Sequence, residues 1–141
     1  MRTIDQLFAR YSEFHRNATN KAIHWVCVPL IVWSVLGMLW AASPIAALLA
    51  IVASMVFFAW LSTRLALGML VVVAVMAGAL ALIDSKALVT SLVVFVVAWI
   101  GQFVGHAVEG KRPSFFKDVQ FLLIGPLWLL AAAYRRFGLS Y

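Results

Sequence analysis

Four apolar runs of about 20 residues limit what this chain can fold into more than any other feature, because a helical run of that length crosses a bilayer. The composition agrees: 65% of the 141 residues are hydrophobic, only 11% are charged and the mean hydropathy is +1.03. We therefore predict one all-α integral membrane domain over residues 1–141. Its four transmembrane helices are expected at residues 23–42, 44–62, 65–83 and 87–105.

Residues 1–22 are mostly polar and predict a helix that lies on the membrane surface. Between residues 3 and 18, apolar side chains recur at spacings of three and four, which is typical of an amphipathic helix. Asn17 and Asn20 then interrupt this pattern. We predict that Asn20 is the N-cap of the first transmembrane helix, as Ser43 is expected to be for the second.

Residues 119–134 form a shorter apolar stretch that contains Gly125 and Pro126 near its middle. A proline inside a helix removes a hydrogen bond and kinks it, and the stretch is short for a membrane crossing. We predict a short C-terminal helix that is re-entrant, interfacial or tilted, with a fifth span as the alternative.

The positions of lysine and arginine predict the orientation. With four spans and a cytoplasmic N-terminus, ten of the eleven basic residues lie on the inside, and only Lys86 lies outside. The N-terminal segment and the loop predicted at 106–118 then share the cytoplasmic face. The net charge of +6 is explained by this asymmetry, so we expect no nucleic-acid partner. The lipid bilayer is the expected environment, with a bacterial inner membrane as the location.

All three histidines of the chain fall where apolar runs meet this face. His15, His24 and His106 come from three separate elements, and imidazole is the commonest transition-metal ligand. Three histidines with open positions form a known type of catalytic metal site. Glu109 follows His106 by three residues and is a candidate fourth ligand or a supporting residue. The alternative is that these histidines are interfacial side chains that stack with aromatic residues and contact lipid headgroups.

Three further polar residues lie near these histidines in sequence. Asn20 precedes His24 by four residues and is placed to hydrogen-bond its ring. Lys111 and Arg112 follow Glu109, and they either serve as charges that fix the topology or bind a substrate carboxylate beside the metal.

Two motifs carry a resemblance to a known family. The first is YxxxHxNxxNxxxHxxxxP from Tyr11 to Pro29, and the second is QFxGHxxEGKRP from Gln102 to Pro113. Together they resemble the small membrane-embedded 2-hydroxy fatty acid dioxygenases of alpha-oxidation, found in fungi and bacteria. The resemblance extends over the whole chain.

The resemblance implies an iron(II)-dependent enzyme. Such an enzyme cleaves a long-chain 2-hydroxy fatty acid with dioxygen and gives the acid one carbon shorter. It implies that His15, His24 and His106 are the essential residues, and we expect Tyr11, Asn20 and Gln102 to support them.

Other classes of protein stay open on the sequence alone. A two-iron hydroxylase or desaturase needs more ligands than this chain has. A transporter should carry polar groups near the bilayer midplane, and the second and third apolar runs have almost none. A haem-binding anchor or a non-catalytic packing subunit does not require polar groups near the bilayer midplane, so both stay open. Zinc in the same three-histidine site would favour a membrane hydrolase.

Overall fold

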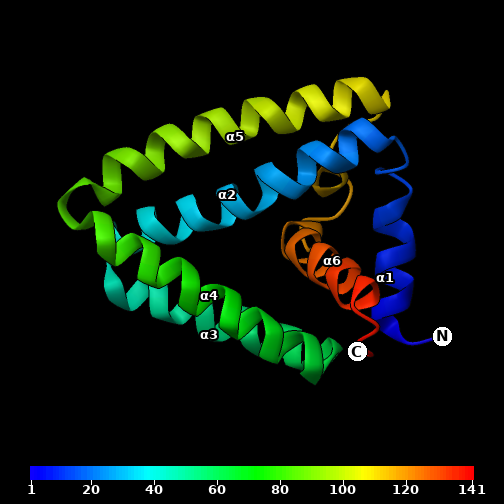
Figure 1. The fold of residues 1–141 in the computed structure, drawn as a ribbon, viewed down its shortest axis with the longest axis horizontal. Helices are drawn as coiled ribbons and strands as arrows, with labels where there is room; N and C mark the ends of the chain where they lie inside the picture. The colour runs from blue at the N-terminus through cyan, green and yellow to red at the C-terminus, as the bar shows by residue number, and fades with distance from the viewer.

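The computed structural model describes all 141 residues, and every regular element is helical. In chain order the elements are α1 (Thr3–Ser12), α2 (Ala18–Ala42), α3 (Pro44–Leu61), α4 (Thr63–Ile83), η1 (Asp84–Lys86), α5 (Ala87–Glu109), η2 (Ser114–Phe116) and α6 (Phe121–Arg136). Helices α2 and α5 pair along their lengths, and α3 pairs with α4 (Figure 1). Helices α1 and α6 lie together near both chain ends, on the side where the two pairs diverge (Figure 1).

Three helical segments are long and apolar enough to cross a membrane. They are Ala18–Ala42, Pro44–Leu61 and the 47-residue stretch Thr63–Glu109. The last is divided by η1, where the chain turns back so that α5 runs beside α2 (Figure 1). These segments support membrane association, whereas the number of crossings stays a prediction. Helix α6, with 16 residues, is not one of the three.

Hydroxyl and amide side chains define where the long helices begin. As predicted, Ser43 caps α3: its Oγ accepts a hydrogen bond from Ala46 N at 3.2 Å. Pro44 occupies the first turn of the helix. The predicted cap of α2 was wrong by one turn. Asn17, not Asn20, is the N-cap, and its Oδ1 accepts from Thr19 N and Asn20 N at 2.8 and 3.2 Å.

Helix α5 continues past the apolar run and ends at Glu109, so the first four residues of the predicted loop 106–118 are helical. Gly110 terminates the helix with a φ of 75°, a left-handed conformation that glycine adopts without steric cost. Hydropathy shows where an apolar run ends, but the backbone stays helical until a residue stops it. This extra turn carries both His106 and Glu109.

Helix α1 is shorter than the predicted 3–18 helix and ends at Ser12. Its apolar face packs against α6: Ile4 and Leu7 are buried together with Ile124 and Leu127. This apolar packing holds α1 against α6, and the chain turns toward the histidine region after α1 ends at Ser12. The position of α1 at a membrane surface stays a prediction.

Candidate metal centre

The structure brings the three histidines together from three elements. His15 lies in the loop after α1, His24 in the second turn of α2 and His106 in the last turn of α5. One ring nitrogen of each lies within 4.8 Å of the others. The three residues are 1%, 2% and 5% exposed. This is a buried cluster, which argues against three independent interfacial side chains.

Backbone carbonyls determine which ring nitrogens of the first two histidines carry hydrogen. His15 Nδ1 lies 2.8 Å from the carbonyl oxygen of Tyr11, and His24 Nδ1 lies 3.0 Å from that of Asn20. A carbonyl can only accept, so each Nδ1 carries the hydrogen and donates it. In a neutral ring each Nε2 is then left with a lone pair.

Those two lone pairs converge on one side of the ring pair, since the ring centroids are only 4.2 Å apart. His15 Nε2 and His24 Nε2 are 2.8 Å apart. Burial lowers the pKa of His15 to about 4, so its ring is neutral at physiological pH. Two converging lone pairs at this distance repel unless a cation lies beside both nitrogens. The arrangement is therefore suited to a bound metal.

His106 completes the donor set. Its ring centroid lies 5.1 Å from that of His15 and 5.0 Å from that of His24. Its Nδ1 is buried and has no hydrogen-bond partner, which is costly for a polar atom in a protein interior. A metal ligated by three neutral imidazoles would satisfy this third ring, and such a donor set suits divalent iron or zinc.

Glu109 connects two of the ligand-bearing segments. Its carboxylate accepts hydrogen bonds from Arg16 N at 3.0 Å, Asn17 N at 2.8 Å and Asn20 Nδ2 at 3.0 Å. These contacts fix the loop that carries His15 against the end of α5. Glu109 is not part of the group that could hold a metal, and its role as a fourth ligand stays a prediction.

Asn20 and Tyr11 hold the ligands through their backbone and their packing. Asn20 does hydrogen-bond the His24 ring, but through its carbonyl rather than its side chain. The Tyr11 ring stacks on His15 with centroids 4.2 Å apart, and burial raises the pKa of its hydroxyl. Trp128 also lies beside His15, with centroids 5.7 Å apart.

The two basic residues proposed for the substrate carboxylate are exposed. Lys111 Nζ donates to the carbonyl oxygen of Glu13 at 2.7 Å. Neither Lys111 nor Arg112 lines the cavity next to the histidines. Lys111 therefore helps Glu109 to hold the loop, and carboxylate binding by either residue stays a prediction.

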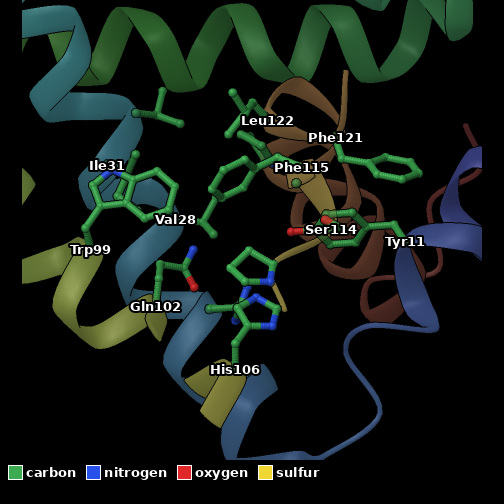
Figure 2. Close-up of a pocket in the computed structure, with 15 residues that line it drawn as sticks. Tyr11, Val28, Ile31, Trp99, Gln102, His106, Ser114, Phe115, Phe121 and Leu122 are labelled. Atoms are coloured by element: carbon green, nitrogen blue, oxygen red, sulfur yellow. The ribbon is translucent and has the colours of Figure 1, made fainter. Parts of the chain in front are cut away.

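A cavity of about 50 Å³ lies beside His24 and His106. Figure 2 shows the Gln102 amide directed toward the His106 imidazole, with Trp99 one turn earlier in α5. Gln102 Oε1 and Trp99 Nε1 are buried without hydrogen-bond partners. Sequence reasoning missed Trp99, although its spacing of three from Gln102 and seven from His106 places all three on one helix face.

Comparison with known proteins agrees with this geometry. The family profile described as 2-hydroxy-palmitic acid dioxygenase Mpo1-like matches residues 1–66 and 62–137. The 2-hydroxy-palmitic acid dioxygenase MPO1 of Saccharomyces cerevisiae is 34% identical over 131 residues, covering 85% of this chain and 73% of the yeast protein. No solved structure matches the chain significantly.

Proposed function

The chain belongs to the Mpo1-like family, and from that premise we propose that it is an iron(II)-dependent dioxygenase of long-chain 2-hydroxy fatty acids. The reaction would use dioxygen and give the fatty acid one carbon shorter. The observation that carries the proposal is the pair of facing Nε2 atoms of His15 and His24, 2.8 Å apart. A divalent cation is the occupant that this donor geometry suits.

Three neutral imidazoles fit iron(II) for two reasons. They leave its positive charge uncompensated, and they leave coordination positions open. Bound there, iron would supply the one-electron chemistry by which dioxygen reacts with an organic substrate.

The residues of the chain orient the donors and keep water away. The carbonyl groups of Tyr11 and Asn20 each hold one Nδ1–H, which directs both Nε2 atoms inward. The packing of α1, α2, α5 and α6 leaves the three histidines almost fully buried. A dry site protects a reactive intermediate from side reactions with bulk water.

We further infer that the fold crosses the membrane four times, with the N-terminus and the histidines at the cytoplasmic face of a bacterial inner membrane. The distribution of ten of the eleven basic residues supports this orientation. A site at that depth suits a substrate with a polar head and an apolar tail.

The test is anaerobic reconstitution of the purified protein with iron(II), followed by 2-hydroxypalmitate and dioxygen. Mass spectrometry of the acyl product should show a fatty acid shortened by one carbon. The product should be absent with His106→Ala and with zinc in place of iron. Wild-type protein that binds iron stoichiometrically and forms no shortened acid would refute the dioxygenase proposal.

A zinc-dependent membrane hydrolase is the second candidate, because three histidines with open positions are also a catalytic zinc site. The same preparation separates the two. A hydrolase would be active toward a fatty acyl ester when loaded with zinc, and its activity would not depend on dioxygen.

A further inference from the structure

Beyond the metal site, the apolar cavities of the molecule follow one line. The cavity beside the histidines shares Val28, Val32 and Pro126 with a second cavity of about 160 Å³. This second cavity lies between α2, α4 and α6, and its walls are almost entirely apolar. A third cavity, of about 270 Å³, lies further along the same two helices, α2 and α4.

The residues that line the second and third cavities show that the third continues the line of the second along both helices. On α2, Val32 lines the second cavity, and Leu36, one turn later, lines the third. On α4, Met76 lines the second and the adjacent Ala77 lines the third. With a rise of 1.5 Å per residue, the line from His24 to Trp40 is about 24 Å long, which suits a long acyl chain.

The polar end of this line is also built for a ligand. Gln102 is 6% exposed, and its Oε1 and the Trp99 Nε1 have no partner at the histidine end. Buried polar atoms without partners are expected where a bound molecule supplies the missing hydrogen bonds. Unpaired polar atoms at one end and apolar walls beyond match a molecule with a polar head and an apolar tail.

The second and third cavities together form what we call the seam between α2 and α4. We propose that this seam is the acyl-chain channel of the site, and that side chains along it set the accepted chain length. The occupant is the tail of a 2-hydroxy fatty acid whose head lies at Trp99 and Gln102. This inference rests on the proposed function for the identity of the head group. It adds which residues contact the tail.

Paired substitutions on α4 test the channel. Val72 lines the second cavity, whereas its neighbour Val71 is 64% exposed on another face. Val72→Phe should lower kcat/KM for 2-hydroxypalmitate by about tenfold to a hundredfold, because a blocked tail misplaces the reacting head. Turnover of 2-hydroxyhexanoate should stay within about twofold of wild type for the same reason. Val71→Phe should leave both substrates unchanged.

A second pair of substitutions tests a position further along the channel from the histidines. Ala77→Phe fills the third cavity, and Ala79→Phe is its control, since Ala79 is exposed and lines none of the three cavities. Ala77→Phe should shift the preferred chain to a length between those preferred by Val72→Phe and by wild type. The channel proposal would be overturned if Val72→Phe and Ala77→Phe still turn over substrate with the same chain-length profiles as their controls.

Photocrosslinking gives a readout that needs no turnover and uses the wild-type protein. A 2-hydroxy fatty acid with a diazirine at its terminal carbon should label residues 36–40 of α2 or 77–81 of α4. Labelling spread over outward faces, such as Val71, would show a tail dissolved in lipid and would overturn the channel. Wild-type protein that is labelled in the seam but forms no shortened acid would support the channel and refute only the proposed reaction.

Discussion

Replacing Gly105 with alanine should weaken the metal centre without changing a histidine. A Cβ at this position would lie 2.6 Å from Asn20 Oδ1 and 3.4 Å from Ile23 Cγ2. Asn20 is fully buried, and its side-chain amide donates to Glu109. Its carbonyl oxygen also holds the His24 ring. The added methyl group therefore cannot be accommodated by a simple side-chain rotation and must move α2 away from α5.

The expected magnitude follows from two opposing contributions. Overpacking a close contact costs about 1–3 kcal/mol. Alanine is favoured over glycine inside a helix by about 1 kcal/mol. The free energy of unfolding of Gly105→Ala should thus fall by up to about 2 kcal/mol. Gly78→Ala is the control, because a Cβ at Gly78 in α4 meets nothing within 4 Å, and only the favourable contribution applies.

Thermal unfolding in detergent and titration with iron(II) measure the two consequences. Gly105→Ala should be less stable than Gly78→Ala by about 1–3 kcal/mol. Because Asn20 supports a ligand, iron affinity should fall by about tenfold to a hundredfold in Gly105→Ala. Equal stability and equal iron affinity in the two variants would show that the contact of α2 with α5 at Asn20 does not position the site.

Three further outcomes are expected. Iron(II) at a hundred times its dissociation constant should raise the free energy of unfolding by about 2.7 kcal/mol, and His24→Ala should abolish this gain in the same melting assay. Glu109→Gln should lower stability by about 1–2 kcal/mol through weaker hydrogen bonds to the loop, whereas Glu13→Gln, whose exposed side chain makes no such bonds, should not. For the metal-free protein, the folded-state pKa of His15 of about 4 lies below the ordinary 6.5, so the unfolded chain binds more protons between these values. The free energy of unfolding should therefore fall as the pH drops from about 6.5 toward 4 and stay level above about 7. A pH series of melts in which stability increases as the pH drops over that interval would contradict the buried, neutral ring.

The sequence predicted the parts of the molecule that depend on residue type and spacing. Apolar runs of spanning length predict long helices whatever their partners are, and α2 to α5 follow them closely. The convergence of the histidines was predicted from the expected topology, in which an even number of crossings returns the chain to one face. The helix cap at Ser43 depends only on neighbouring residues and was also predicted.

What could not be predicted depends on contacts between distant residues. Asn17 and Asn20 are equally good caps by type, and the choice is fixed when Glu109 accepts from both residues across the helix pair. The tautomers of His15 and His24 depend on carbonyl groups placed by the fold. Trp99 has the expected spacing, but only the packed structure leaves its Nε1 without a partner beside Gln102.

The three ligands are held by different kinds of contact. His24 and His106 stand on two helices that pack closely, with Gly101 and Gly105 of α5 facing α2. Their separation is therefore set by α2 side chains that pack directly on the backbone of α5. His15 instead lies in a loop, and its position depends on the apolar contact of α1 with α6 and on the hydrogen bonds to Glu109. The helix pair thus forms the rigid half of the site, and the α1–α6 layer positions the third ligand over it.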